Sequence, residues 1–280
     1  MLLLPDVSEF QPSADLAGIK KLNGGAVILR AAYGAFHPDT AFARHRQAAA
    51  ELGYGFCGLY HYLVAGQDAA AQARAFISLA GHLAPHEVAI LDLEEGDGDQ
   101  SGRAAMWARI VDGTLGGTSW LYSGLSFARD HGLAPIFNGP RHTWVAAYGN
   151  TEPGLPHTLW QCTDGRVGSN ITSWPGAGRC DTSLYRGTLD RLAALTRAGT
   201  PKAAVAAAGP REWTTAGQGS LAALAQAHGT EPSAILRLTA EHSPGSVFDP
   251  ATARYLNGIF AGTADPRAPM PAGLKLWLPG

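Results

Sequence analysis

The sequence contains little charge and no long hydrophobic run. Only 16% of its 280 residues are Asp, Glu, Lys or Arg, and the formal net charge is -2. Roughly a quarter is usual in soluble domains, so the chain lacks the basic surface that is typical of proteins that bind nucleic acid or anionic membranes. No apolar stretch reaches the length of a membrane-spanning helix. Any partner must therefore be bound by local groups rather than attracted by overall charge.

Cysteine is scarce as well. Cys57, Cys162 and Cys180 are too few for a disulfide scaffold or a zinc site, and we expect them to be small, buried, apolar side chains. The opening Met1–Pro5 segment is too short for the apolar region of a signal peptide, and no basic residues precede it. We therefore expect a protein that is made in the cytoplasm and reaches an outside target by another route.

Short β-rich segments alternate with helix-compatible segments through the first 196 residues. The predicted strands are Leu2–Ser8, Ala26–Ala31, Gly55–Tyr60, Val88–Leu93, Ser119–Ser123, Thr143–Ala147 and Thr158–Cys162. The predicted helices are Asp39–Leu52, Asp68–Leu83, Gly102–Gly113 and Leu125–Gly132, with Asp39 and Asp68 as N-caps. This order predicts an α/β fold, an irregular (β/α) barrel of TIM type whose later units have little room for helices. A doubly wound open sheet is the alternative, although no glycine-rich phosphate loop follows the first strand.

The composition changes after residue 196. Residues 197–210 are dominated by Ala, Gly and Pro, which predicts a linker between two domains. Residues 211–280 predict a small domain of β-α-α-β order, too short to build a large core alone. Its expected elements are a strand at Glu212–Thr214, a helix at Leu221–His228 capped by Ser220, a second helix at Glu231–Leu238 and a closing strand within Pro271–Pro279.

Acidic residues follow two of the predicted buried strands. Asp92 and Glu94 come after an apolar run and fall on one face of the strand, because side chains alternate along it. Asp6 ends the first strand in the same way, and Asp181 lies near the end of the barrel region. The C-terminal strand ends of a β/α barrel assemble its active site, and neighbouring carboxylates supply the acid and base of glycoside cleavage. Solvated strand ends or a site for a hard cation are the alternatives.

Aromatic and hydrogen-bonding side chains cluster at the same strand ends. Sugar rings pack against aromatic rings, and amide or imidazole groups bond to hydroxyl and acetamido groups. For each residue the alternative is a core position with one polar edge. The residues predicted to contact a sugar are Tyr33, Tyr60, His61, Tyr62, Tyr122, Trp144, Trp160 and Gln161, and Phe10, Gln11 and Tyr148 belong to the same cluster.

Several of these stretches occur in an order that resembles a known family. They are residues 6–11 (DVSEFQ), 30–34 (RAAYG), 58–62 (GLYHY), 91–94 (LDLE), 121–123 (LYS), 144–148 (WVAAY) and 160–161 (WQ), followed by Asp181, Tyr185 and Gly187. This set is similar to glycoside hydrolase family 25, the lysozymes of the Chalaropsis type found in fungi, bacteria and phage endolysins. The resemblance implies a flattened β/α barrel that cleaves the β-1,4 bond after N-acetylmuramic acid.

The resemblance also implies roles for individual residues. It makes Glu94 the general acid, Asp92, Asp6 and Asp181 the other catalytic acids, and Tyr60 and Trp160 substrate contacts. Two routes stay open: attack by the substrate's own acetamido oxygen with help from Asp92, or attack by water activated by Asp6 or Asp181. We expect no metal and no cofactor.

Three further features belong to the resemblance. Phe10 stands where the family usually has Trp, which is expected to alter a subsite, and Glu95 or Asp97 is a candidate for binding a cation or a substrate amine. If Gln161 and Asp181 lie nearly opposite each other on neighbouring strands, Cys162 and Cys180 become close enough to bridge.

Residues 211–280 resemble a LysM module, a unit that binds N-acetylglucosamine. Gly219–Ala225, Gly229–Thr230 and Pro271–Pro279 carry the match, whereas Ser246–Pro269 is an insertion and Thr239-Ala240 replaces the usual Asn. The expected protein is a monomeric peptidoglycan hydrolase, a 1,4-β-N-acetylmuramidase of the phage endolysin kind, that acts on the cell wall after release. The alternatives are a glycan-binding or virion tail-associated module without catalysis and a hydrolase of chitin-type chains.

Overall fold

Two units make up the chain, residues 1–201 and residues 202–280. The computed structural model describes residues 1–197, 211–216, 220–227, 235, 255, 265 and 268–278. Among the described residues, no helix has both the length and the apolar character needed to cross a lipid bilayer.

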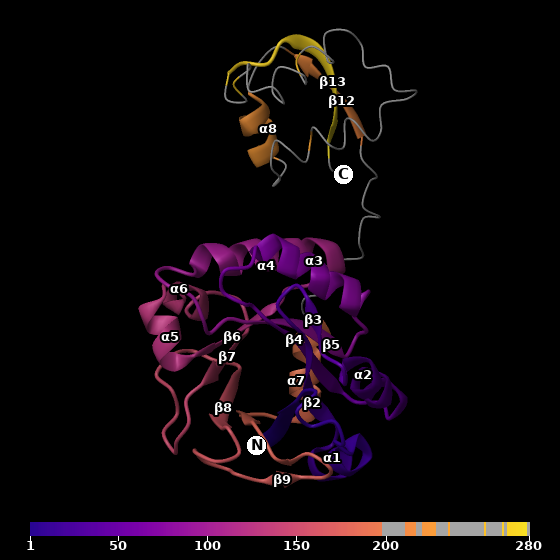
Figure 1. Cartoon of the computed structure of the whole chain (residues 1–280), viewed down its shortest axis with the longest axis vertical. Helices are drawn as coiled ribbons and strands as arrows, with labels where there is room; N and C mark the ends of the chain where they lie inside the picture. Colours follow the sequence, from indigo (N-terminus) through magenta and orange to yellow (C-terminus); the bar gives the residue numbers. More distant parts are fainter. Residues whose placement is uncertain are drawn as a thin grey trace. The chain divides into compact units, whose positions relative to one another are not determined.

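Eight strands of the first unit close into a barrel (Figure 1). Seven are parallel neighbours in chain order, and β11 lies antiparallel between β8 and β1 and closes the ring. The short strand β3, His37–Pro38, pairs antiparallel with the last two residues of β2, beyond the part of β2 that pairs with β1. The predicted irregular β/α barrel is therefore confirmed. The barrel strands are β1 Leu2–Val7, β2 Ala26–Tyr33, β4 Phe56–Tyr62, β5 Glu87–Asp92, β6 Trp120–Gly124, β7 Thr143–Ala146, β8 Leu159–Thr163 and β11 Thr182–Tyr185.

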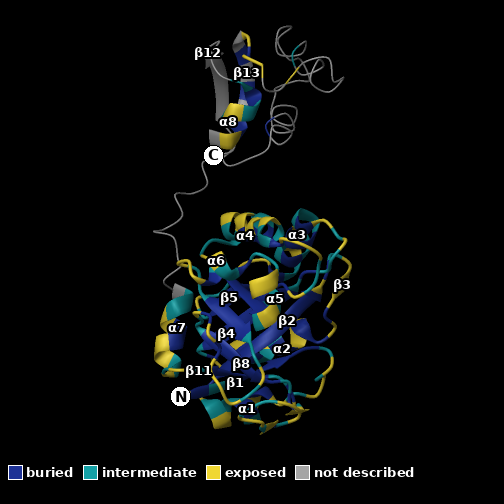
Figure 2. Ribbon diagram, turned by 90° about the vertical axis from the view of Figure 1, so that its left-hand side faces the viewer, coloured by how far each residue is buried: buried dark blue, intermediate teal, exposed yellow. Residues whose placement is uncertain are grey.

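Helices cover the outside of the barrel, where their buried faces meet the strands (Figures 1 and 2). Residues 147–158 and 164–181 are described in full and contain no helix; a two-stranded hairpin of β9, Ser173–Trp174, and β10, Gly178–Arg179, lies in the second segment. The later part of the barrel is irregular, as predicted. The helices are α1 Leu16–Asn23, α2 Phe42–Glu51, α3 Ala69–Ala80, α4 Ser101–Leu115, α5 Leu125–Asp130, α6 Ala134–Phe137 and α7 Leu189–Arg197.

One predicted helix cap is confirmed and one is wrong. Asp68 caps α3, since its side chain accepts a hydrogen bond from the Ala71 amide at 2.7 Å. The N-cap of α2 is Ala41 rather than Asp39. Asp39 lies two residues before this N-cap and forms an ion pair with Arg30 at 2.8 Å (Oδ2 to Nε).

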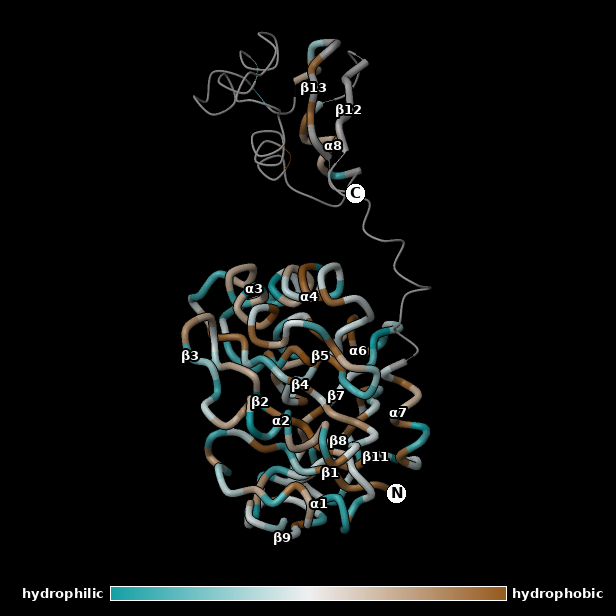
Figure 3. The backbone as a smooth tube through the Cα atoms, turned by 90° about the vertical axis from the view of Figure 1, so that its right-hand side faces the viewer, coloured by the Kyte–Doolittle hydropathy of each residue, from teal (hydrophilic) through white to brown (hydrophobic). Residues whose placement is uncertain are grey.

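Side-chain alternation along the strands produces two hydrophobic layers, and apolar residues dominate the strands (Figure 3). Inside the barrel, Ile28, Phe56, Ile90, Trp120 and Trp144 belong to one buried cluster. The alternate residues point outward and pack against the helices, as Leu29, Leu59, Leu91, Leu121 and Val145 do. Leu192 of α7 joins the inner cluster. Burying each large side chain is worth about 1.5–3 kcal/mol. A shift of a strand by one residue would lose this free energy at several positions, so the face on which each side chain lies is strongly determined.

The cysteines are free and buried, as first expected, and the predicted bridge between Cys162 and Cys180 is wrong. The register of β11 and β8 places Ser183 rather than Asp181 opposite Gln161. Cys162 packs in a small cluster with Trp160 and Leu184, whereas Cys180 belongs to the outer layer. The two thiols therefore point into different clusters.

The second unit contains an antiparallel strand pair, β12 Arg211–Ala216 and β13 Ala272–Leu278, with one helix, α8 Leu221–Ala227. Ser220 caps α8 as predicted, because its Oγ accepts a hydrogen bond from the Ala223 amide at 3.1 Å. Buried Leu221, Ile235, Leu274 and Leu276 share one cluster. Both predicted strands and the first helix lie where expected. Residues 198–210 and the predicted helix at Glu231–Leu238, apart from Ile235, lie outside the described residues.

Candidate active site

All four predicted acids line one cavity of about 350 Å³ at the C-terminal ends of the barrel strands. Residues from several strands and from the segments that follow them contribute to its wall. The lining residues are Asp6, Ser8, Phe10, Gln11, Arg30, Tyr33, Tyr60, Tyr62, Asp92, Glu94, Tyr122, Trp144, Gln161 and Asp181.

Strand alternation explains how Asp6 and Asp92 reach the cavity. Each occupies the last inward position of its strand, after the apolar residues that fill the inner cluster. Asp6 is 8% exposed and Asp92 4% exposed, so both carboxyl groups lie deep. Glu94 follows two residues after Asp92 and is exposed, about 6–7 Å further along at Cβ from the rise per residue of a strand.

Asp181 reaches the same end of the barrel by a different route. It directly precedes β11, which runs antiparallel to its neighbours, so the start of β11 lies beside the C-terminal ends of the other strands. The Asp6 amide donates a hydrogen bond to the Asp181 carbonyl at 3.1 Å, which holds the two acids next to each other. The antiparallel closing strand therefore supplies the fourth carboxylate.

Burial raises the pKa of all four acids, and the charge of at least one neighbouring acid adds to it in each case. The pKa of Asp6 and of Asp92 lies well above the ordinary value, through burial first and then through the charges of neighbouring acids. Glu94 is open to solvent on one side and crowded by protein on the other; partial burial, followed by the charge of Asp181, raises its pKa to about 7. Burial, followed by the charge of Asp164, raises the pKa of Asp181 to about 6. Protonated and ionised carboxyl groups therefore coexist near neutral pH.

Gln161 joins the acids to two tyrosines. Its Nε2 donates to Asp6 Oδ2 at 3.1 Å and to Asp181 Oδ2 at 3.4 Å. Its Oε1 accepts from the hydroxyl groups of Tyr122 at 2.8 Å and Tyr148 at 3.2 Å. Asp92 differs from these acids: its buried Oδ1 has no hydrogen-bond partner within the described part of the chain. Because an unpaired buried acceptor is costly, this atom is suited to a donor supplied by a ligand.

Six of the eight predicted sugar contacts line the cavity: Tyr33, Tyr60, Tyr62, Tyr122, Trp144 and Gln161. Tyr33 and Tyr62 stack with their ring centroids 4.6 Å apart, and Tyr122 and Trp144 lie 4.2 Å apart at a tilt. Tyr33 faces the cavity although it is three residues from Arg30, because a β-bulge between Arg30 and Ala32 changes the alternation of β2. The rings give the cavity an aromatic wall beside its acids.

His61 and Trp160, the other two predicted contacts, lie on the outer face of the barrel. His61 is fully buried, its ring lies 6.0 Å from that of Phe76, and burial lowers its pKa to about 4. The Trp160 indole packs with Cys162 and donates to the Ala147 carbonyl at 2.7 Å. Both residues have inward-facing neighbours in the chain, so alternation directs them outward. The structure therefore corrects both predictions.

Two cavity residues, Ser8 and Arg30, were missing from the predicted site. Arg30 follows inward-facing Ala26 and Ile28 on β2, a signal that alternation provides. Its guanidinium bonds to Asp39 and to Glu9 at 2.8 Å each, and it lies 4.9 Å below the Phe10 ring. The Arg30 guanidinium therefore fixes the segment that carries Ser8 and Phe10, because it bonds to Glu9 within that segment.

The acidic run after Glu94 has a structural use. Glu95 accepts hydrogen bonds from the Tyr62 hydroxyl at 3.3 Å and from the Ala65 amide. These bonds hold the segment after β4 against the segment after β5, so Glu95 is engaged by the protein. Asp97 is exposed and does not line the cavity. Within the described residues, no group of three or more His, Cys, Asp or Glu is arranged to hold a metal ion.

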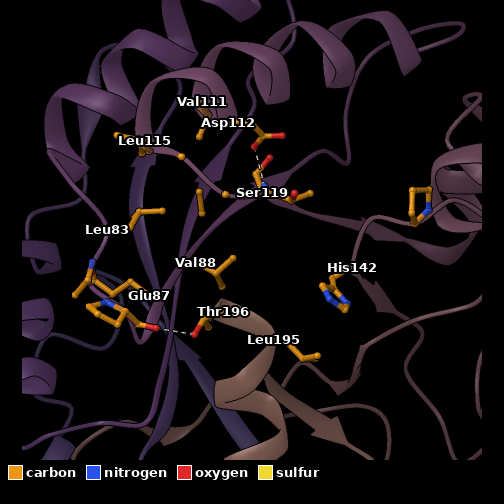
Figure 4. A pocket seen from close by; sticks show the side chains of 17 residues that line it. Leu83, Glu87, Val88, Val111, Asp112, Leu115, Ser119, His142, Leu195 and Thr196 are labelled. Atoms are coloured by element: carbon orange, nitrogen blue, oxygen red, sulfur yellow. Dashed lines mark hydrogen bonds between the residues drawn. The ribbon is translucent and has the colours of Figure 1, made fainter. Parts of the chain in front are cut away.

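A second cavity of about 350 Å³ lies at the opposite end of the barrel (Figure 4). It is lined by Glu87, the first residue of β5, whereas Asp92 is the last residue of the same strand. Its acids already have partners: Glu87 pairs with Arg46 at 2.7 Å, and Asp112 pairs with Arg141 at 3.0 Å. Paired acids next to apolar walls lack the proton chemistry of the first cavity.

Comparisons with known proteins agree with this geometry. The model of a family described as glycosyl hydrolases family 25 matches residues 5–171. A muramidase from Trichobolus zukalii is 22% identical over 71% of this chain and all of its own, with a TM-score of 0.60. A lysozyme from Streptomyces coelicolor is 21% identical over 71% of this chain and 98% of its own, with a TM-score of 0.61.

The catalytic domain of an endolysin from a bacteriophage of Listeria monocytogenes is 26% identical over 70% of this chain and 98% of its own, with a TM-score of 0.57. These three structures share the barrel fold of this chain. No curated protein matches the chain.

Proposed function

The chain belongs to glycosyl hydrolase family 25 and is a glycoside hydrolase, and we propose that it is a muramidase that cleaves the β-1,4 bond between N-acetylmuramic acid and N-acetylglucosamine in peptidoglycan. The observation that carries this proposal is the convergence of Asp6, Asp92, Glu94 and Asp181 in one cavity. A module that only binds glycan has no need of four acids with raised pKa values. The similarity to a muramidase, a lysozyme and an endolysin supports the choice of substrate.

Glu94 is the proposed general acid. It is the one acid of the four that is exposed, so a bound glycan can reach its carboxyl group. Its pKa of about 7 keeps a large share of it protonated at neutral pH, as proton donation to a leaving oxygen requires. Asp6 and Asp92 lie deeper and are less suited to this contact.

Asp92 is the proposed partner of the substrate's acetamido group. Burial favours its neutral form, and its Oδ1 has no hydrogen-bond partner among the residues that the structure describes. An acetamido N–H that donates to this oxygen favours the ionised form, so the proton moves to another acid of the cavity when substrate binds. The acetamido oxygen then attacks the anomeric carbon while Glu94 protonates the leaving oxygen, and water later opens the cyclic intermediate as Glu94 takes back a proton.

The alternative is direct attack by water that Asp6 or Asp181 deprotonates. The two routes differ in the configuration of the product, because the acetamido route inverts the anomeric carbon twice and retains it. Proton NMR of the first product therefore separates them. A β-anomer formed first is expected, and an initial α-anomer would replace the acetamido route by the water route.

The stacked pair Tyr33–Tyr62 and the tilted pair Tyr122–Trp144 are the proposed sugar-binding wall. Pyranose rings pack their C–H faces on such rings. Both pairs line the same cavity as the acids, so a sugar ring that packs there lies beside the acid cluster.

For residues 211–280 we propose a wall-binding role as a LysM-like domain, joined to the barrel domain, residues 1–196, by a linker at 197–210. The strand pair, the capped helix α8 and their shared cluster support it. We further propose that the protein acts as an endolysin, as a monomer, on the wall after release from the cell. Sedimentation of the full chain with insoluble walls under conditions where Glu94→Gln prevents cleavage tests the binding role; protein that stays in the supernatant contradicts it.

A matched pair of variants tests the catalytic proposal. Glu94→Gln keeps the side-chain volume but removes the proton donor, whereas Asp97→Asn alters an exposed acid three residues away, outside the cavity. Release of reducing ends from purified walls and from chitin oligomers should be lost in the first variant and kept in the second. Equal release by Glu94→Gln and the parent excludes Glu94 as the acid, and faster cleavage of chitin than of walls favours the chitin-type alternative.

A further inference from the structure

Gln161 has no hydrogen-bonding capacity left for a sugar. A glutamine side chain has two N–H donors and two lone pairs on its oxygen. In this structure both donors face carboxylates, those of Asp6 and Asp181, and the oxygen accepts from two tyrosine hydroxyl groups. The side chain is 2% exposed. Although it lines the cavity, Gln161 is therefore bonded to the acids rather than free for substrate.

The two acids and the two tyrosines together determine which way the amide points. Burial raises the pKa of Tyr122 and of Tyr148, so both hydroxyl groups stay protonated and act as donors. An ionised carboxylate only accepts hydrogen bonds, whereas a tyrosine hydroxyl can donate as well as accept, so all four bonds form only when the NH₂ group faces the acids and the oxygen faces the hydroxyl groups. The nitrogen of Gln161 must then face the opposite side, toward Asp6 and Asp181. Groups on β1 and β6 and in the segments after β7 and before β11 therefore all favour the same orientation of the amide.

We propose that Gln161 is a positioning residue that keeps negative charge on the Asp6–Asp181 pair and, through that charge, keeps Glu94 protonated. Two carboxylates that lie side by side tend to share one proton, because both ionised forms repel. One NH₂ group that donates to both of them offsets this repulsion and fixes their separation. The inference rests on the proposed muramidase function and adds a residue to its machinery that does not touch substrate.

The charges around the cluster agree with this chain of effects. The hydrogen bond from Gln161 lowers the pKa of Asp6 against the larger effect of burial, and the charge of Asp181 raises the pKa of Glu94. The other titratable or charged groups that face the cluster come from the surrounding strands and the segments beside them. They are Asp92 of β5, Tyr60 and Tyr62 of β4, Arg30 of β2, Tyr122 of β6, Glu95 after β5, Tyr148 after β7, Asp164 after β8 and Cys180 before β11. None of these groups donates a hydrogen bond to both Asp6 and Asp181, among the bonds found in the described residues.

Two substitutions of similar volume give opposite predictions for one limb of the pH–rate profile. Gln161→Met removes the donors without adding charge: the Asp6–Asp181 pair takes up protons more readily, so the acidic limb moves to higher pH and the basic limb, set by Glu94, moves to lower pH. Gln161→Glu removes the donors and adds a negative charge, so both limbs move to higher pH. Each shift should be roughly one pH unit, the size expected for one hydrogen bond to a charged group. A role in folding alone does not move the basic limb in opposite directions.

The decisive measurement combines these profiles with titration of the Asp6 carboxyl carbon by NMR in the unliganded full chain. The NMR titration does not depend on activity, so it tests Gln161 even if the parent cleaves no wall and the proposed function fails. The expected result is a higher pKa of Asp6 in Gln161→Met and a narrower profile. Unchanged titration of Asp6, or basic limbs that move in the same direction in both variants, overturns the proposal.

Should either variant fail to fold, Tyr148→Phe supplies the same test in weaker form. It removes one of the two donors that orient the amide, at the half-exposed residue Tyr148. A higher pKa of Asp6 in this variant supports the positioning role. The parent value overturns it, because the orientation of the amide then does not depend on the hydroxyl groups.

Discussion

The acids of the cavity are held at a cost in stability, and Asp181 shows this most clearly. Its pKa is about 6 instead of 3.8, chiefly through burial. At about 1.4 kcal/mol for each pKa unit, a rise of about 2 destabilises the folded protein at pH 7 by at most ~3 kcal/mol. Because water partly reaches Asp181 and its protons are shared with neighbouring acids, we expect Asp181→Asn to gain roughly 1–2 kcal/mol. That gain corresponds to about 3–6 °C in Tm for a unit of this size.

The stability difference between Asp181→Asn and the parent should depend on pH. The folded protein holds the Asp181 proton more tightly than the unfolded chain, so the stabilising contribution is present below pH 4 and is lost as the pH rises through about 6. Asparagine has no such proton. The advantage of Asp181→Asn should therefore be present at pH 7 and absent at pH 4.

Urea unfolding followed by tryptophan fluorescence at both pH values measures this difference. Asp97→Asn is the control, because Asp97 is exposed and should change stability by less than about 0.5 kcal/mol. Two results would refute this reasoning: Asp181→Asn is no more stable than the parent at pH 7, or it is equally stabilised at both pH values. Either result would show that burial of the ionised Asp181 carboxylate does not destabilise the folded protein.

Three other parts of the structure can be tested independently. Tyr62→Ala removes one ring of the stacked pair in the cavity and should raise KM for wall fragments about tenfold, a loss of ~1–1.5 kcal/mol; an unchanged KM contradicts the sugar-binding wall. His61→Phe alters a side chain on the outer face of the barrel and should leave KM within about twofold, so a large rise in KM would return His61 to the site. Thiol titration of the unfolded, unreduced protein should find three free thiols, and one free thiol would indicate a bridge.

The positions of the strands and two of the acids were predictable because local patterns determine them. Asp92 follows an uninterrupted apolar run, and the alternation that places it inside the barrel is a property of any strand. The same rule, applied to residues 60–62, allows Tyr60 and Tyr62 to face the cavity and directs His61 to the outer face of the barrel. Applied to β2, it brings in Arg30. The alternation of side chains along each strand was therefore enough to predict where these residues point.

Other features depend on contacts between distant segments. Asp181 enters the site because β11 runs antiparallel, a direction that no local pattern specifies. Asp39 has the side chain of a good cap, yet its ion pair with Arg30 outweighs that preference. Gln161 was expected to bond to sugar, and only the tertiary structure shows that four protein groups already use its amide. Cys162 and Cys180 stay apart because the pairing of β8 with β11 places Ser183 opposite Gln161, and the two thiols lie in different clusters.

We propose that this four-acid cavity cleaves the bond after N-acetylmuramic acid. The most direct test is to digest purified peptidoglycan with the full chain, reduce the new ends with borohydride, and identify them by mass spectrometry. We expect reduced muramic acid at the new ends with the parent and none with Glu94→Gln. New ends that consist of reduced glucosamine, or muramic-acid ends that persist in Glu94→Gln, would contradict it.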